Sequence, residues 1–417
     1  MAQFKAYPKY KDSGVEWLGE VPEHWKISNI KRSTYLKGRV GWKGLTSNEF
    51  EVNSFAYLVT GTDFKQKYVN WSSCYQINES RYEDDPYIQL KNGDLLMTKD
   101  GTIGKLAIVK NLNKSACLNS GIFLIRPEKY YSTEFMYWVL NSNAFNLFFV
   151  MNTTGSTILH LYQNVFERFV FSYPNFKEQE RIVSYLNLET AKIDTLIAKQ
   201  EKLIELLKER IIALAMTEQI HGKGKLVRLC SVAHEVIRPV RLDDAADYVA
   251  LGLYNRGRGL FHKPLTLGKD MGDSTFFYVD SGDLIISGQF AWEGAVAMAS
   301  HNESGCVVSH RYPVIKGSVV DTMYLFALFM SDYGNFLLND CSRGSAGRNR
   351  PLNKNILLKQ KIRMPSDEVQ KKIKDIFEKK QQLEININTT IEKLKEYRAS
   401  VISHAVTGKI DVRELVA

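Results

Sequence analysis

The side chains best suited to reading nucleic acid are concentrated in residues 343–354. This segment carries guanidinium, amide, hydroxyl and ammonium groups between glycine and proline breaks: Arg343, Ser345, Arg348, Asn349, Arg350 and Lys354. Such groups recognise base edges in the major groove, or phosphates, when a loop presents them. A structural loop rarely needs so many guanidinium groups. We therefore expect this segment to contact DNA.

A second segment offers hydroxyl, imidazole and amide groups in place of the guanidinium groups. Its members are Ser156, His160, Gln163 and Asn164. Both segments contain a Gly-Ser pair, Gly155-Ser156 in one and Gly344-Ser345 in the other. Different side chains on these two segments would suit different nucleic-acid ligands.

Three further groups of polar side chains lie beside glycines or in loops that link strands. They are Arg39, Trp42 and Lys43, then Lys99 and Lys105, and finally Asn255, Arg256 and Arg258. We expect phosphate contact from these groups more often than base recognition. Ordinary surface charge is the alternative for each.

The sequence lacks the motifs of the enzymes that act on DNA. Gly101–Lys105 is too short for a nucleotide-binding P-loop. Asp85-Pro86-Tyr87 has one proline fewer than the motif of amino-methyltransferases, and no Gly-rich cofactor turn follows a convincing strand. Asp94 with Lys99 is too loose a grouping for a nuclease centre. We expect no catalytic residue in this chain.

Metal, disulfide and membrane signals are also weak. The five cysteines form no C-x-x-C pair, and His301, Cys306 and His310 match no usual ligand spacing. No stretch of about 18 apolar residues occurs, and the first residues do not resemble a signal peptide. These features predict a cytoplasmic protein that has no metal site and does not contact a membrane.

The positive charge is concentrated in two parts of the chain. The net charge is +9, to which residues 1–176 contribute +4 (20 basic against 16 acidic) and residues 226–365 contribute +3 (16 against 13). Residues 177–225 and 366–417 contribute +1 each. A polyanionic partner of the two basic parts fits this distribution, although a role in solubility fits it equally well.

Sliding the chain on itself by about 190 residues reveals an internal repeat. Asn92–Leu96 corresponds to Ser281–Ile285 and Thr154–Ser156 to Arg343–Ser345, both at an offset of 189. Pro174 corresponds to Pro365 at an offset of 191. Because the matches occur in one order, the chain is predicted to contain two copies of one fold.

The strongest repeated feature is an apolar heptad pattern that predicts two long helices. Its apolar positions include Ile182, Leu186, Leu196 and Leu203 in the first copy, and Ile373, Phe377, Ile387 and Leu394 in the second. Each run spans about 50 Å as a helix and ends near a glycine, Gly222 or Gly408. We expect the two helices to pair antiparallel; separate packing of each helix on its own block is the alternative.

The predicted fold class is α+β, with two mixed α/β domains and an antiparallel pair of helices. Short β-prone segments such as 95–97, 106–109, 122–125, 284–286 and 306–308 precede helical stretches over 133–147 and 321–338. The predicted boundaries are residues 1–176 and 223–365 for the two domains. The helical parts are residues 177–222 and 366–417, the latter with a tail.

Several segments closely resemble type I restriction-modification specificity subunits. The N-terminal run Tyr10–Trp25 resembles the opening of that family. Further resemblance lies in GRVGWKGLT (38–46), KDGTIGK (99–105), KEQERI (177–182), FAWEGAV (290–296) and HAVTGKID (404–411). The first helix departs from the family pattern because it ends in IHGKG rather than VTGKID. The resemblance covers nearly the full chain.

This resemblance implies a non-catalytic subunit whose two target-recognition domains each read one half of a split, asymmetric DNA site. It further implies that the helices set the gap and dock two modification subunits, which carry S-adenosylmethionine and methylate adenine. Restriction subunits, up to two of them, would add ATP- and Mg-dependent cleavage. Two other classes stay open at this point: a coiled-coil scaffold without a DNA partner, and a fused methyltransferase or nuclease.

Overall fold

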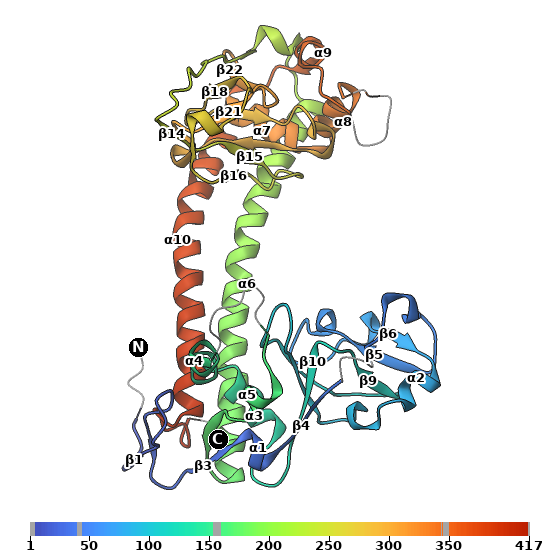
Figure 1. Cartoon of the computed structure of the whole chain (residues 1–417). Coiled ribbons are helices and arrows are strands. Elements are labelled where there is room, and N and C mark those ends of the chain that lie inside the picture. Colours follow the sequence, from blue (N-terminus) through green and yellow to red (C-terminus); the bar gives the residue numbers. More distant parts are fainter. Residues whose placement is uncertain (1–4, 40–43, 153–159, 343, 345–349, 416–417) are drawn as a thin grey trace. The chain divides into compact units, whose positions relative to one another are not determined.

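The computed structural model describes residues 5–39, 44–152, 160–342, 344 and 350–415, and these form two units. Unit 1 combines the chain up to Ile197 with the segment from Thr390 onward, and unit 2 is Ala198–Thr389. The long helices α6 (Phe176–His221) and α10 (Asp367–Val406) each contribute one part to each unit (Figure 1). Each unit is described below by itself.

Unit 1 is built on the antiparallel sheet β4-β10-β7-β8, beside a three-stranded sheet β6-β5-β9 that contains one parallel pair. Strand β3 pairs with β11, and β1 pairs with β2. The bounds are β1 Tyr10–Asp12, β2 Glu20–Pro22, β3 Lys26–Asn29, α1 Ile30–Ser33, β4 Thr34–Gly38, β5 Ala56–Val59, β6 Tyr75–Ile77, α2 Glu79–Glu83, β7 Leu95–Thr98, β8 Leu106–Ile108, β9 Ala116–Leu118, β10 Ile122–Pro127, α3 Thr133–Leu140, α4 Asn143–Asn152, α5 Gln163–Phe166 and β11 Val170–Tyr173.

Unit 2 repeats the main features of this arrangement with the sheet β13-β22-β19-β20 and the pair β12-β23. Two-stranded pairs β14-β17, β15-β16 and β18-β21 complete it. The bounds are β12 Leu226–Arg228, β13 Ala233–Glu235, β14 Asp247–Tyr248, β15 Leu251–Leu253, β16 Leu260–His262, β17 Thr266–Leu267, β18 Phe276–Tyr278, β19 Leu284–Ile286, β20 Val296–Met298, β21 Val307–Ser309, β22 Val314–Gly317, α7 Thr322–Met330, α8 Asp332–Asp340, α9 Lys354–Lys359 and β23 Lys361–Arg363.

The long helices bury their apolar stripes both against each other and against the sheet and short helices of each unit. In unit 1, Ile182 and Leu186 of α6 share a core with Val401 and Ala405 of α10. In unit 2, Ile211 and Ala215 of α6 share a core with Ile373 and Phe377 of α10. The early part of α6 thus packs with the late part of α10, and the late part of α6 with the early part of α10, which is the order of an antiparallel pair. Both cores also contain residues of the adjoining sheet and helices.

The predicted α+β class, the two long helices and the internal repeat are confirmed. Each predicted aromatic-rich helix, however, is two helices: α3 and α4 replace 133–147, and α7 and α8 replace 321–338. The break falls at buried Ser142 and Ser331, whose hydroxyls bond back to the carbonyls of Val139 and Leu328, 2.6 Å away in each case. Such local side-chain bonds compete with helix continuation.

The repeat extends to individual hydrogen bonds at the start of each long helix. The Gln179 amide oxygen accepts from the backbone N–H of Ser132, the N-cap of α3, at 2.9 Å. The Gln370 amide oxygen accepts from the backbone N–H of Asp321, the N-cap of α7, at 2.8 Å. One glutamine therefore joins a long helix to a short helix in each unit.

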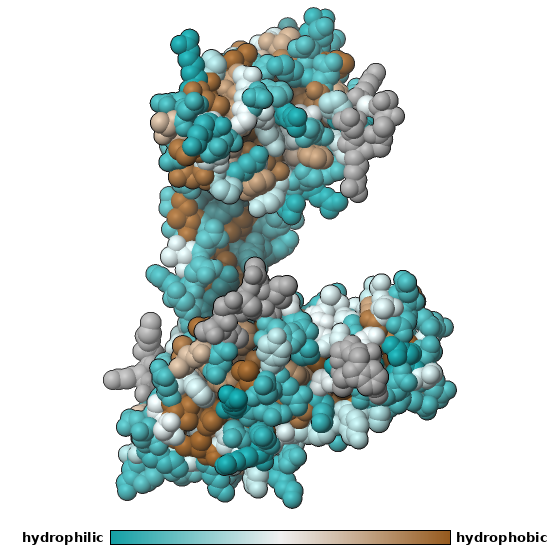
Figure 2. Space-filling view, in the orientation of Figure 1, coloured by the Kyte–Doolittle hydropathy of each residue, from teal (hydrophilic) through white to brown (hydrophobic). Residues whose placement is uncertain are grey.

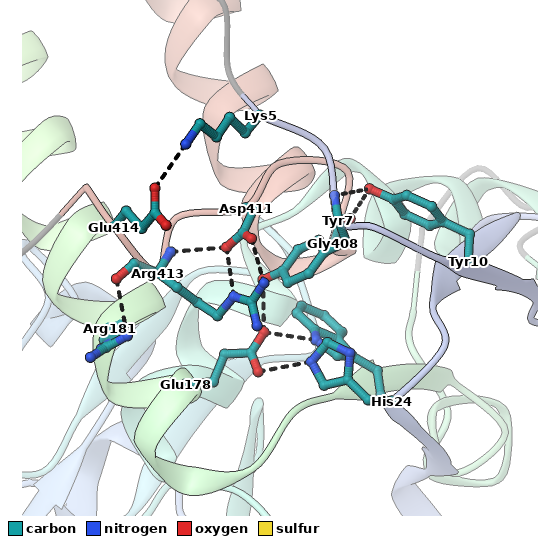
Figure 3. Close-up of polar contacts among 11 residues, drawn as sticks. Lys5, Tyr7, Tyr10, His24, Glu178, Arg181, Gly408, Asp411, Arg413 and Glu414 are labelled. Atoms are coloured by element: carbon teal, nitrogen blue, oxygen red, sulfur yellow. Dashed lines mark hydrogen bonds and ion pairs between the residues drawn. The ribbon is translucent and has the colours of Figure 1, made fainter.

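The first and last described segments meet at Glu178, on the first turn of α6 (Figure 3). This buried carboxylate accepts from the Tyr7 hydroxyl at 2.7 Å and from the Trp25 indole at 3.0 Å, and it pairs with His24 at 3.0 Å. Burial and the bond to Glu178 raise the pKa of Tyr7, so its hydroxyl stays protonated and can donate. Tyr10 donates to the carbonyl of Gly408, 3.0 Å away, on the C-terminal side of α10.

The two terminal motifs that resemble the specificity-subunit family therefore pack together. Gly408 has a φ of +72°, and a Cβ atom there would lie 2.3 Å from Pro22, so a side chain would be excluded. Lys409 donates to the carbonyl of Glu20, 2.5 Å away. The motifs Tyr10–Trp25 and His404–Asp411 therefore hold the first and last segments of unit 1 together.

Replacing Gln179 by Ala should lower the free energy of unfolding by about 2 kcal/mol, because the Ser132 N–H and two carbonyls lose a buried partner. Gln370→Ala should cost less, about 1 kcal/mol, since Gln370 is partly exposed. Glu180→Ala, at an exposed neighbour, is the matched control. Urea unfolding followed by circular dichroism measures all three. Equal stability of Gln179→Ala and the control would contradict the role given to this glutamine.

Candidate nucleic-acid interface

A buried aspartate fixes the start of corresponding strands in the two units. The Asp94 carboxylate, just before β7, accepts from the backbone N–H of Lys91 at 2.8 Å and from Arg126 at 2.5 and 2.7 Å. Asp283, just before β19, accepts from Asp280 N–H at 2.9 Å and from Arg238 at 2.6 Å. The hydrogen bonds to these carboxylates raise the pKa of both arginines, which therefore stay charged. The strand that leads into each loop therefore starts from a buried, hydrogen-bonded base.

In unit 2, this base carries a cluster of three chain segments, which we call the unit 2 loop cluster. Its segments are residues 254–259, the β19–β20 turn at 288–294, and residues 350–354. Arg256 N–H donates to the Glu293 carbonyl at 3.0 Å, and Gly257 N–H donates to the Gly294 carbonyl at 2.9 Å. Leu352 N–H donates to the Gly288 carbonyl at 2.8 Å. Three segments far apart in the sequence are thereby joined.

Left-handed backbone makes these close contacts possible. Arg256 has a φ of +59°, Gly257 of +59° and Gly294 of +68°. A Cβ atom on Gly257 would lie 2.0 Å from the end of Met330. The Asn255 amide donates to the Glu293 carboxylate, which adds a side-chain bond to the backbone bonds. The loop at 254–259 is thus held in place from two sides.

Two arginines of the unit 2 loop cluster lie over aromatic rings. The Arg258 guanidinium is 5.3 Å from the centre of the Tyr254 ring, and the Arg350 guanidinium is 5.4 Å from the centre of the Trp292 ring. Arg350 also donates to the Asn339 amide oxygen at 2.6 Å. Ring contact restricts a guanidinium while leaving other N–H groups to bind an anion or a base edge. This arrangement suits a phosphate or guanine ligand.

Unit 1 joins the corresponding segments with different side chains. Leu161 N–H donates to the Lys99 carbonyl at 3.0 Å, and the His160 imidazole contacts the Asp100 carboxylate. Lys99 also pairs with Asp100, at 3.1 Å. The turn at 99–105 and the segment from residue 160 therefore form the unit 1 loop cluster. Imidazole, ammonium and carboxylate groups meet here in place of guanidinium groups. Aromatic rings take part in this cluster too, because the Lys99 ammonium lies 5.9 Å from the centre of the Phe123 ring and the ring centres of His160 and Tyr162 are 4.5 Å apart.

The remaining predicted residues of unit 1 occupy varied positions. Lys105 and Asn164 are exposed. Gln163 donates to the Leu36 carbonyl at 3.3 Å and to Glu167 at 2.9 Å. Arg39 is 4% exposed and donates to the Leu118 carbonyl at 2.9 Å, which assigns it to the core rather than to a ligand-facing surface.

Other predicted residues are placed as follows. In unit 2, exposed Lys354 forms an ion pair with Glu235 at 2.7 Å. Seven of the predicted residues lie outside the described part of the chain: Trp42, Lys43, Ser156, Arg343, Ser345, Arg348 and Asn349.

Most of the helical residues predicted to bind partners are buried within the chain itself. Ile182, Leu186, Ile373, Phe377 and Ile387 are at most 7% exposed, because they form the apolar stripes of the units. Leu394 is half-buried. Leu196 and Leu203 of α6 are 47% and 41% exposed, as are Leu188 and Leu206 at 51% and 49%. With Phe176 at 49% and Ile220 at 48%, these leucines are the exposed large apolar residues of α6 that a partner could contact.

Sequence reasoning did not single out the aromatic and acidic partners of the loop clusters. Trp292 and Glu293 were noticed as part of the FAWEGAV segment, but without a role. Tyr254 stands four residues before Arg258, a spacing that could have indicated a ring beneath the guanidinium. Asp100 gives no comparable signal, because its contact with His160 spans 60 residues of chain.

Two other properties of the described residues bear on function. No helix in this part of the chain is both long and apolar enough to cross a membrane. Within the same residues, no group of three or more His, Cys, Asp or Glu side chains could hold a metal ion. Hydrophobic and hydrophilic side chains are interspersed over the visible face of both units (Figure 2).

Two repeated α/β blocks, each with a loop cluster next to its main sheet, define the architecture of the chain. Residues 45–206 match the family model described as Type I restriction modification DNA specificity domain. The predicted resemblance to type I specificity subunits is confirmed.

Two curated relatives from Methanocaldococcus jannaschii support this assignment. The Type I restriction enzyme MjaVIII specificity subunit is 24% identical over 217 residues, which cover 50% of this chain and 49% of the relative. The MjaIX specificity subunit is 22% identical over 228 residues, which cover 51% and 47%. The chain thus matches about half the length of these relatives.

A solved structure shares the fold over nearly the whole chain. It comes from work on complex assembly and conformational transition of the type I R-M system, and it aligns with a TM-score of 0.62 at 13% identity. The alignment covers 94% of this chain and 99% of the other.

Replacing Asp283 by Ala should lower the free energy of unfolding by about 2–4 kcal/mol, because Arg238 and the Asp280 N–H would lose a fully buried acceptor. Asp273→Ala, at an exposed aspartate of the same unit, is the control. Calorimetry of the two variants gives the comparison. A melting temperature of Asp283→Ala as high as that of the control would rule out the buried pair as the support of the loop cluster.

Proposed function

We propose that this chain is the DNA-binding specificity subunit of a type I restriction-modification complex. Each recognition block reads one half of a bipartite, asymmetric DNA site. The observation that carries the proposal is a shared scaffold with different loop chemistry. Asp94 and Asp283, each bonded to an arginine of its own unit, support corresponding strands. The loop clusters beside these strands differ: unit 1 has His160 and Lys99 there, and unit 2 has Arg258 and Arg350.

Different donors at corresponding places suit two different half-sites. Arginine pairs bidentately with guanine, whereas amide side chains pair with adenine. Unit 2 has arginines held over rings, and unit 1 has the amides Gln163 and exposed Asn164 close to His160 in the chain. The match of residues 45–206 to the DNA specificity domain supports the same substrate.

The chemistry of the complex belongs to partner chains in this proposal. The chain itself is not an enzyme and binds no cofactor. Two modification subunits bind S-adenosylmethionine and methylate adenine, and restriction subunits, where present, bring ATP and Mg. The modification subunits dock on the long helices, where the exposed leucines of α6 offer apolar contacts. Because the proposed substrate is cellular DNA, we expect the complex to act in the cytoplasm.

The decisive experiment combines the purified chain, its modification subunit, S-adenosylmethionine and a DNA library with random sequence. We expect adenine methylation at one split site, and no methylation by the chain alone. The logarithm of the DNA association constant should fall linearly with the logarithm of the salt concentration, because phosphate contacts release bound counterions. Methylation by the chain alone would assign it to the enzymes, and absent or salt-insensitive DNA binding by the complex would favour a scaffold.

Arg258→Ala and Arg350→Ala should each weaken binding by about 1–3 kcal/mol and relax specificity within one half-site only. The control is Arg228→Ala, at an exposed arginine on β12, which belongs to a different sheet of unit 2. Competition binding with singly substituted sites provides the measurement. Uniform weakening over all sites, with a shallower salt slope, would instead assign the arginine to a phosphate.

A further inference from the structure

Unit 2 contains a pocket of about 650 Å³ that the proposed function does not use. Helix α7, the unit 2 parts of α6 and α10, and residues 257–260 and 297–303 surround it. Its apolar lining includes Ile211, Ala327, Met330 and Phe377. In Figure 1, α7 lies beside the end of α6 in this unit. The pocket is open to solvent on one side.

The internal repeat explains why unit 2 has space at this position. Ala327 of α7 stands 189 residues after Trp138 of α3. The same offset relates the N-caps Ser132 and Asp321 of the two helices. A methyl group in unit 2 therefore corresponds to an indole in unit 1.

In unit 1, that indole is buried by the chain's own residues. Trp138 is 3% exposed and belongs to the core that includes Leu186 of α6. The Lys67 ammonium lies 5.4 Å from the ring centre and donates to Asn187 of α6 at 2.8 Å. The Trp138 ring thus packs between α3 and α6, and the Lys67 ammonium lies over the ring.

We propose that the unit 2 pocket binds an aromatic side chain of a partner polypeptide. Trp138 shows the group that fits the equivalent position. The cations Lys208, Lys380 and Arg258, which can contact a ring face, line the pocket together with the carboxylates Glu205, Glu303 and Glu384. Lys380 is already oriented by an ion pair with Glu384 at 2.7 Å. The lining also includes Gly257–Gly259 of the unit 2 loop cluster. The partner therefore touches a loop proposed to bind DNA, although the pocket itself does not depend on DNA binding.

N-acetyl-tryptophanamide is the probe for this site, and N-acetyl-alaninamide is its control. We expect one molecule to bind the full chain with a dissociation constant on the order of 1 mM, as for a small ligand that buries one ring. In a chain with ¹³C-labelled methionine methyls, the signals of Met298 and Met330 should shift, because both residues line the pocket. The control should leave them unchanged.

Two matched variants test the role of the repeat. Ala327→Trp should fill the pocket, weaken probe binding at least tenfold and raise the melting temperature without ligand. Trp138→Ala should open the equivalent space in unit 1 and raise the number of bound probes from one to two. Ala327→Met, a smaller change that also fills space, replaces Ala327→Trp if the latter does not fold.

The proposal is overturned if wild-type protein shows no methionine shifts at a probe concentration roughly ten times the expected dissociation constant. It is also overturned if filling the pocket leaves binding unchanged. Adenosine, tested in parallel, separates a side-chain site from a purine site. Shifts with adenosine but not with the tryptophan probe would assign the pocket to a nucleotide and end the proposal.

Discussion

A helix of 46 residues with an apolar stripe is stable in water only where other residues cover that stripe. Most other features of the structure depend on this constraint. In both units the cover comes from the second long helix together with the sheet and short helices of the unit. The loop clusters in turn rest on the strands of these cores.

The same constraint explains which parts of the fold could be predicted from sequence. Heptad spacing and the repeat identified both long helices, their antiparallel pairing and the α+β class, because burial of a stripe leaves a periodic signal. The periodic pattern does not predict the breaks at Ser142 and Ser331, because aromatic and aliphatic residues resume soon after each serine; the polar neighbours Asn141, Asn143 and Asp332 are the local signal for a break. A single hydroxyl bonded to the preceding turn decides the break, and periodicity does not record it.

The loop clusters were predictable in part. Glycine-rich sequence and arginines indicated residues 254–259 and 350–354, but not that these segments meet through the turn at 288–294. Arg39 shows the opposite error, because an arginine beside glycines resembled a surface group and lies in the core. Charge and spacing identify groups that can bind a ligand, whereas burial depends on contacts between distant residues such as Arg39 and Leu118.

Unit 1 is assembled from two distant pieces of chain, whereas unit 2 is one continuous segment. During synthesis on the ribosome, unit 2 therefore has all its residues while the Tyr10 hydroxyl still lacks its acceptor, the carbonyl of Gly408. The core that holds Ile182 and Leu186 is completed only when Val401 and Ala405 emerge. The later-synthesised unit can thus fold first, and the N-terminal block reaches its final state last.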